Sequence, residues 1–128
     1  YNADEINVTG TGLVASGGTS VNVGVILSHT FTTGVITFDD VDTFATALSI
    51  NSGNLADVIS YLETNITTNL HTAAFAYDST GSGVADATMV FNSSTATGGD
   101  SLIELVGVTG VTAVVVAATT TANQIFVL

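Results

Sequence analysis

Lysine and arginine are both absent from this chain of 128 residues, whereas aspartate and glutamate together number 11, so the formal net charge at pH 7 is −11. Proteins bind nucleic acid largely through the counterions that lysine and arginine release, and they bind anionic lipid with the same side chains. We therefore expect no nucleic-acid partner and no anionic lipid partner. Catalysis through a lysine Schiff base or an arginine finger is excluded for the same reason.

Cysteine, proline and tryptophan are absent as well. Without cysteine the chain forms no disulfide, no thiolate metal site and no cysteine nucleophile. It also offers no trypsin-type cleavage site and no thiol to misoxidise, which suits a protein that stays outside the cell for long periods. Together with the many threonines, serines, glycines and valines, these absences predict an extracellular, β-rich protein of the cell surface.

Long hydrophobic runs are missing too. The longest apolar stretches, such as residues 111–118, are far shorter than the ~20 residues that span a bilayer, so we expect no membrane span. The length suits one domain over residues 1–128, and a mean hydropathy of +0.58 is the opposite of the composition that keeps acidic chains disordered. The chain begins with Tyr1 rather than methionine, so we expect a mature product or a piece of a longer protein.

Short β-type runs, broken by glycine, are predicted before and after the middle of the chain. The turn signals of the first part are Gly17-Gly18 and Thr33-Gly34, and its predicted strands are residues 5–8, 12–15, 21–27 and 35–38. The valines of residues 21–25 alternate with other residues and are expected to share one face. The predicted strands of the second part, spaced as in an antiparallel meander, are residues 71–77, 87–92, 101–106, 111–117 and 124–128.

The middle of the chain changes to helical spacing. Over residues 39–48, apolar side chains recur at intervals of three and four, at Val41, Phe44, Ala45 and Leu48. A second set, with Ser52 or Asn54 as its N-cap, consists of Leu55, Val58, Ile59, Leu62 and Ile66. These patterns predict an α+β fold, mostly β, whose antiparallel sheet or sandwich carries two short helices inserted near residues 39–66. The two helices are expected to form a hairpin over one sheet face.

The strongest local pattern lies in residues 77–86. Oxygen-bearing residues fall there at alternate positions, as a calcium loop requires, and the glycine of its sixth position is Gly83. The candidate calcium ligands are Asp78, Thr80, Ser82, the carbonyl of Val84, and Asp86. The twelfth position, where calcium loops place a bidentate carboxylate, is Met89. A glycine-rich hairpin turn between two strands is the alternative interpretation.

Two runs also carry a family resemblance. Residues 77–91 read YDSTGSGVADATMVF and residues 100–110 read DSLIELVGVTG. Both runs, in roughly the last third of the chain, resemble the C-terminal regions of type I-secreted, S-layer-like and RTX-type bacterial extracellular proteins. The resemblance implies calcium-dependent folding outside the cell and assembly into a lattice or fibre. The glycine-aspartate nonapeptide repeats that hold calcium in RTX proteins are missing. The apolar end of the chain resembles an uncleaved C-terminal secretion signal.

The remaining candidate sites carry less chemistry. Asp39, Asp40 and Asp42 could share a cation, although their place in the first turn of a predicted helix favours capping. His29 lies in a strand-like region and His71 begins a strand. A nucleophile elbow needs a serine between glycines at a strand-to-helix turn, whereas the Gly-Ser-Gly of residues 81–83 lies in a turn between predicted strands. We therefore expect no enzymatic activity.

Two functions remain open. The first is a structural subunit of an extracellular surface layer or filament, a homopolymer that assembles through its chain ends. Residues 125–128 are consecutive apolar residues, so both faces of the predicted strand 124–128 are apolar and must be covered. The predicted interface residues are Ile6, Val8, Ile125, Phe126, Val127 and Leu128. The second is an adhesin-like module that binds carbohydrate or another surface ligand. The sequons of Asn7, Asn65 and Asn92 are candidate glycosylation sites, so a glycan is a candidate partner.

Overall fold

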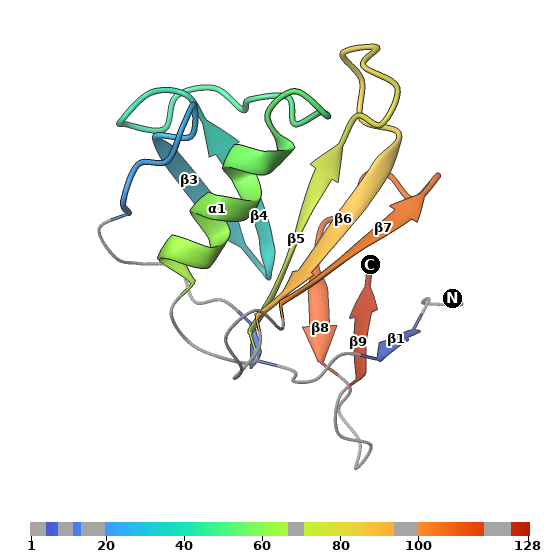
Figure 1. Ribbon diagram of the computed structural model, residues 1–128. Coiled ribbons are helices and arrows are strands. Elements are labelled where there is room, and N and C mark those ends of the chain that lie inside the picture. Colours follow the sequence, from blue (N-terminus) through green and yellow to red (C-terminus); the bar gives the residue numbers. More distant parts are fainter. Residues whose placement is uncertain (1–4, 8–11, 14–19, 67–70, 94–99, 117–123) are drawn as a thin grey trace.

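The computed structural model describes residues 5–7, 12–13, 20–66, 71–93, 100–116 and 124–128. Figure 1 shows the elements and their labels. In chain order they are β1 (Glu5–Asn7), β2 (Gly12–Leu13), β3 (Ser28–Thr32), β4 (Val35–Asp39), α1 (Leu55–Asn65), β5 (His71–Tyr77), β6 (Ala87–Asn92), β7 (Ser101–Val106), β8 (Val114–Val116) and β9 (Gln124–Val127).

The strands form two sheets. The larger sheet has the order β3-β4-β5-β6-β7, with β2 also paired to β5, and the smaller sheet has the order β1-β9-β8. The β4–β5 and β2–β5 pairs are parallel, whereas β3–β4, β5–β6 and β6–β7 are antiparallel. The fold is α+β and mostly β, as predicted, but the large sheet is mixed rather than antiparallel. The mixture arises because the chain passes from β4 to β5 through α1, and such a crossover returns the next strand in the same direction.

The molecule has three layers, with α1 on one face of the large sheet and the small sheet on the other (Figure 1). Between α1 and the sheet lies the main core, in which Phe38 makes edge-to-face contacts with Tyr61 and Phe75 at ring-centroid distances of 6.0 and 5.5 Å. Its buried residues are Ile26, Ile36, Phe38, Ile50, Val58, Tyr61, Leu62, Ile66, Ala73, Phe75, Tyr77, Ala87, Met89 and Phe91. The second core, under the small sheet, consists of Ala74, Val90, Val114 and Ile125.

Helix α1 confirms one of the two predicted helices. Of its buried residues, Val58 and Leu62 belong to the predicted apolar set, whereas Tyr61 does not, and Asn54 is its N-cap. The Asn54 side chain does not cap the helix itself, because its Oδ1 accepts the backbone N–H of Asn51 at 2.8 Å. Among the described residues, no helix is both long and apolar enough to cross a membrane.

The other predicted helix, over residues 39–48, is wrong, because Asp39 ends β4 and residues 40–48 form an irregular loop. The N–H groups that a helix would use are taken elsewhere. Asp39 accepts the backbone N–H groups of Ala45 and Thr46, and Leu48 donates its N–H to the carbonyl of Phe38. An aspartate that bonds to nearby backbone competes with helix formation in this way. The predicted helical hairpin is therefore replaced by one helix and a loop.

The strand predicted over residues 21–27 is also wrong. A tight turn is found there instead, in which Val23 and Ile26 exchange backbone hydrogen bonds of 3.0 and 2.9 Å. Gly24 has a φ of 56°, and an added Cβ would collide with the carboxylate of Asp57 on α1. The alternating valines do not share a buried face, since Val21 and Val25 are 59% and 47% exposed.

The strands predicted at residues 71–77, 87–92 and 101–106 are confirmed without change as β5, β6 and β7. The strands predicted at residues 5–8, 12–15, 111–117 and 124–128 are found, within the described residues, as β1, β2, β8 and β9. β8 begins at Val114 rather than at residue 111, and β9 ends at Val127. The strand predicted at residues 35–38 is β4, which continues to Asp39. β3 had no counterpart among the predicted strands.

Candidate functional site

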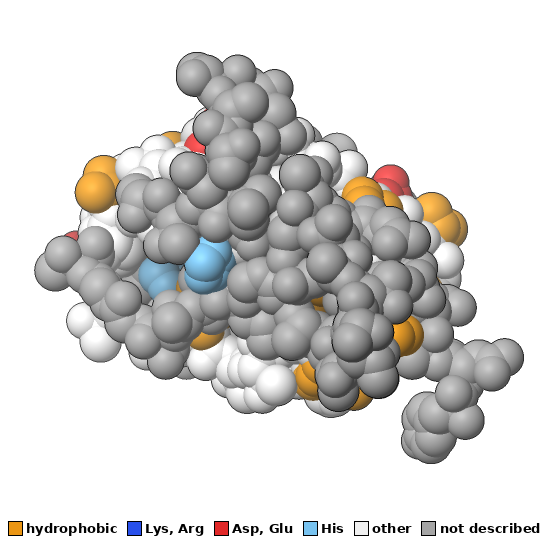
Figure 2. Space-filling model, turned by 90° about the horizontal axis from the view of Figure 1, so that it is seen from below, with side chains coloured by type: hydrophobic (Ala, Val, Ile, Leu, Met, Phe, Trp, Pro, Cys, Tyr) orange, Lys and Arg blue, Asp and Glu red, His pale blue; other side chains and the backbone are white. Residues whose placement is uncertain are grey.

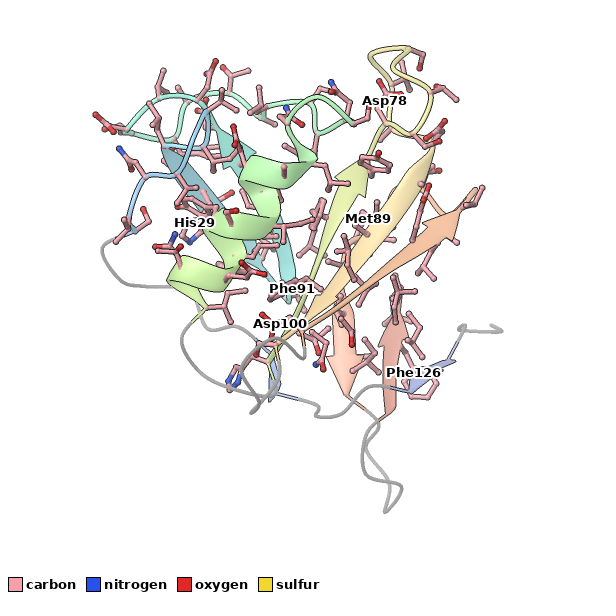
Figure 3. All side chains as sticks on the ribbon, viewed as in Figure 1. His29, Asp78, Met89, Phe91, Asp100 and Phe126 are labelled. Carbon is pink, nitrogen blue, oxygen red and sulfur yellow. The ribbon has the colours of Figure 1, made fainter. Side chains whose placement is uncertain are left out.

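The predicted calcium loop connects β5 to β6 at one end of the large sheet, where Figure 3 labels Asp78. The Asp78 side chain is buried, and its carboxylate accepts the backbone N–H groups of Gly81, Ser82 and Gly83 at 2.7, 3.0 and 2.6 Å. Burial alone raises the pKa of Asp78. The N–H groups of Gly83, Ser82 and Gly81 together outweigh it and hold the pKa below its ordinary value.

The other predicted ligands surround the same loop. Asp86 accepts the backbone N–H of Ser79 at 2.7 Å and its hydroxyl at 3.0 Å, and the Ser79 N–H is the main cause of a lowered pKa at Asp86. The hydroxyl of Thr80 donates to Asp78 at 3.2 Å. The carbonyl of Val84 accepts the Ser82 hydroxyl at 3.3 Å, and the Val84 side chain is exposed. The structure therefore brings the predicted residues into one loop and ties them to one another.

The direction in which the polar groups point distinguishes a calcium loop from a hairpin turn. A calcium loop turns its oxygen atoms inward to a shared centre. Here backbone N–H groups point inward to the Asp78 carboxylate, so a cation would have to displace the donors that shape the turn. Within the described part of the chain, no group of three or more His, Asp or Glu side chains is placed to hold a metal ion. The hydrogen bonds thus favour the hairpin-turn interpretation, and calcium binding stays a prediction.

Asp39 holds a second loop in the same manner. It ends β4 with its side chain buried, and it accepts the N–H groups of Asp40, Ala45 and Thr46 at 2.7, 2.6 and 2.8 Å. The bonds from Ala45 and then Thr46 are the largest causes of a lowered pKa at Asp39. Because β4 and β5 are parallel, Asp39 and Asp78 lie at the same end of the sheet.

The three aspartates 39, 40 and 42 do not converge on one point. Asp40 is exposed, and Asp42 accepts the side-chain amide of Asn22 at 2.8 Å.

The side chains of two of the three sequon asparagines form hydrogen bonds within the fold. Asn92 is buried and donates to the Thr72 hydroxyl at 2.8 Å, and Asn65 donates to backbone carbonyls. The side chain of Asn7 lies outside the described residues.

The chain ends lie together in the small sheet, where Figure 3 labels Phe126. β1 and β9 pair antiparallel, with Ile6 opposite Ile125, and the Ile125 side chain is buried. Phe126 and Val127 are half-buried, whereas Leu128 is 50% exposed. Val8 lies outside the described residues. The strands predicted to meet a neighbouring subunit therefore meet each other within one chain, where β9 is paired on both sides and β1 on one side among the described residues.

The two outer strands of the large sheet, β3 and β7, have each only one strand partner among the described residues. Following the pairings across the sheet, β7 runs in the direction of β5 and β4, and β3 runs the opposite way. If one copy of the sheet is placed beside another with the same face forward, β7 of the first meets β3 of the second antiparallel. Antiparallel pairing is the arrangement that a simple edge-to-edge addition needs.

The backbone of β3 is arranged to accept such a partner. Phe38 of β4 turns its carbonyl away from β3, since that carbonyl accepts the N–H of Leu48 at 2.8 Å. His29 lies opposite Phe38 in the register, so the pair does not exchange hydrogen bonds. The N–H and C=O of His29 therefore point outward, away from the sheet, and by alternation so do those of Phe31.

The backbone of β7 is arranged in the matching way. Gly107, directly after the strand, donates its N–H to the carbonyl of Asp86 at 3.0 Å, on the side of β6. Because peptide groups alternate along a strand, those of Leu102, Glu104 and Val106 point outward. These three side chains lie opposite Phe91, Met89 and Ala87 of the main core, so they share the face that α1 covers. On both edges, the residues with outward peptide groups are those that face α1.

His29 lies at the β3 edge beside α1 (Figure 3). Its Nδ1 forms a 2.6 Å hydrogen bond with the Tyr61 hydroxyl, and its ring packs edge-on against Phe31 and Tyr61. Burial lowers the pKa of His29 and raises that of Tyr61. The other histidine, His71, begins β5. Histidine side chains reach the surface on the face seen in Figure 2.

The predicted strands do not include β3, which forms one edge of the sheet, although the sequence places His29 in a strand-like region and the turn after β3 is a further signal. Thr33-Gly34 was recognised as a turn, and both residues have positive φ, 48° and 78°. A two-residue turn of that kind joins two antiparallel strands. The residues before Thr33 therefore had to form a strand beside β4.

The chain matches no protein-family model, no curated protein and no solved structure.

Proposed function

We propose that the chain is a structural subunit of an extracellular surface layer or filament, and that identical copies join through β3 and β7. The observation that carries the proposal is the match between these two edges. They run in opposite directions, expose peptide groups at residues of the same face, and have five and six residues. Each subunit would continue the sheet of the one before it.

The distribution of charge supports these edges as the contact. With a net charge of −11, copies repel each other wherever acidic residues meet. β3 has no acidic residue and β7 has only Glu104. Neither strand contains the proline or lysine that blocks edge pairing in monomeric proteins.

The edges are different surfaces, so the contact is head-to-tail. A head-to-tail contact leaves a free edge at each end of the assembly, and it produces an open filament unless the rotation between subunits closes a ring. The exposed apolar residues Leu102 and Val106, at 36% and 77% exposure, lie along the contacting edge of β7 and would be covered in the polymer. The location outside the cell rests on the composition and on the resemblance of the last third of the chain.

The experiment is to measure polymer formation by sedimentation and electron microscopy for the wild type and for Glu104→Pro. Proline removes the outward N–H of residue 104, which has no partner strand in the monomer but donates across the proposed contact. The matched control is Glu104→Thr, which keeps the N–H. We expect the wild type and Glu104→Thr to polymerise at micromolar concentration, and Glu104→Pro to stay monomeric with an unchanged far-UV circular dichroism spectrum.

Two results would contradict the proposal. A Glu104→Pro variant that polymerises like the wild type would place the contact elsewhere. A wild-type chain that stays monomeric at high concentration would exclude the polymer, and retention of that monomer on a glycan array would favour the adhesin-like binding module.

A further inference from the structure

We infer that β7 of one copy pairs with β3 of the next in the single register that places Glu104 opposite His29 of the next copy. The inference rests on the proposed function and specifies which residues meet. In this register Leu102 lies opposite Phe31, whereas Val106 falls beyond the end of β3, where the Leu27 N–H donates inward to the carbonyl of Asp39. The two cross-strand pairs that β3 forms on the face covered by α1 are then one apolar pair and one pair of carboxylate with imidazole.

Neighbouring registers that keep the same face are worse. A shift of two residues in one direction places Glu104 opposite Phe31 and leaves Leu102 opposite Thr33, which belongs to the turn after β3. The opposite shift moves Glu104 past the end of β3, beside Leu27, and places Leu102 opposite His29. Both shifts place the Glu104 carboxylate against an apolar side chain. Directly opposed side chains in a sheet are close enough for such a mismatched pair to be unfavourable.

One ring nitrogen of His29 is available to bind Glu104 of another copy. Its Nδ1 is engaged by the Tyr61 hydroxyl, which fixes the ring, and within the described residues no hydrogen bond uses its Nε2. The side chain is half-buried in the isolated subunit. Glu104 is exposed at the other edge, so the two groups come together only between copies. A pair of this kind fixes the register in the way that a single polar pair does in other repeating assemblies.

The opposite face of the contact provides positions for a chemical test. In the inferred register, Ser101 lies opposite Thr32 of the next copy, and both residues are exposed. This pair does not exchange backbone hydrogen bonds, so its Cα atoms are ~4.5 Å apart, within the range of a disulfide. Within one copy the same residues lie at the two outer strands, four strand spacings or ~19 Å apart, and cannot be bridged.

The experiment compares two double variants in a chain that has no cysteine of its own. Thr32→Cys with Ser101→Cys tests the inferred register. Thr30→Cys with Ser101→Cys is the matched control, because Thr30 is also exposed and lies on the same strand, two residues away. Assembly of each variant is first measured under reducing conditions. Oxidation then gives covalent ladders on a denaturing gel where cysteines of adjacent copies are opposed.

We expect the Thr32 variant to form long ladders at least ten times faster than the Thr30 variant. Polymers that form no ladder with the Thr32 variant, or ladders that form as fast or faster with the Thr30 variant, would overturn the register while leaving edge-to-edge assembly in place. Absence of polymers in both variants and in the wild type would overturn the proposed function and the inference with it.

Discussion

The carboxylate of Asp78 accepts the backbone N–H of Gly83 at 2.6 Å, across the loop that joins β5 to β6. Gly83 has a φ of 86°, a left-handed conformation that lets its N–H turn inward. The carboxylate of Asp78 thus takes the central position that a bound cation has in a calcium loop. The backbone of the loop folds around this one charged group.

Removing the Asp78 carboxylate should lower the stability of the protein even in the absence of calcium. We expect Asp78→Asn to lower the melting temperature clearly more than Asp86→Asn, because Asp78 accepts three backbone N–H groups and Asp86 accepts one. If the hairpin-turn interpretation holds, neither calcium nor a chelator should move the wild-type melting temperature. A calcium-dependent rise in the wild type that disappears in Asp78→Asn would instead identify the loop as the calcium site that the sequence pattern predicts.

The same hydrogen bonds predict how stability depends on pH. The folded-state pKa values of Asp39, Asp78 and Asp86 lie below the ordinary 3.8, so the unfolded chain binds more protons as pH falls. Their contribution is present above pH ~3.8 and is lost below it. We expect the free energy of unfolding, measured with urea, to fall between pH 5 and pH 2.5, with a shallower fall in Asp39→Asn. An equal slope in both proteins would show that Asp39 is not one of the groups responsible.

The chain ends give a prediction that differs from the one made on sequence alone. Because Ile125 is buried in the second core, Ile125→Ala should destabilise the monomer by about 2–5 kcal/mol. Leu128→Ala is the matched control, since Leu128 is half exposed, and it should change stability far less. Urea unfolding of both variants tests this. An Ile125→Ala variant that does not assemble but unfolds like the wild type would indicate that the subunit interface lies at the chain ends.

The sequence predicted best where local pattern and tertiary environment agree. β6 is buried along its whole length. Clear turn residues separate the apolar runs of β5, β6 and β7 from one another. The predicted helix over residues 39–48 failed because a single carboxylate, that of Asp39, takes two of its N–H groups. Helical spacing does not reveal that competition.

The candidate contact was harder to predict because it depends on relations between distant residues. The outward direction of the His29 peptide follows from the bond between Phe38 and Leu48, and the opposite direction of β3 and β7 follows from the crossover through α1. Neither can be derived from the residues of β3 or β7 alone. The apolar end of the chain was recognised correctly as a strand, but its partner was the other end of the same chain.

The pair of Glu104 and His29 predicts that assembly strengthens as the medium becomes mildly acidic. In the free subunit, burial holds the pKa of His29 below 6.5, so its ring is neutral at pH 7. A carboxylate from the next copy raises that pKa in the polymer, so the polymer binds more protons than the free subunit. By linkage, assembly must then become more favourable as pH falls through the pKa that His29 has in the polymer.

The other groups around His29 do not reverse this sign. The described contacts of its ring are with Phe31 and the Tyr61 hydroxyl, and Phe38 lies opposite on β4. Tyr61 has a raised pKa and stays neutral in this range. The remaining carboxylates also repel less as they are protonated, so the measurement needs a variant that keeps them and removes only the pair.

That variant is Glu104→Gln, which preserves shape and backbone hydrogen bonding. We expect the critical concentration for wild-type assembly, measured by sedimentation, to fall about three- to ten-fold between pH 7.5 and pH 5.5, as one charge pair at a partly exposed site allows. Glu104→Gln should show a much smaller change over the same range. His29→Gln should behave like Glu104→Gln, and the double variant should behave like either single one. If the single variants keep the full pH dependence of the wild type, the two residues do not face each other in the polymer and the pH response belongs to the other carboxylates.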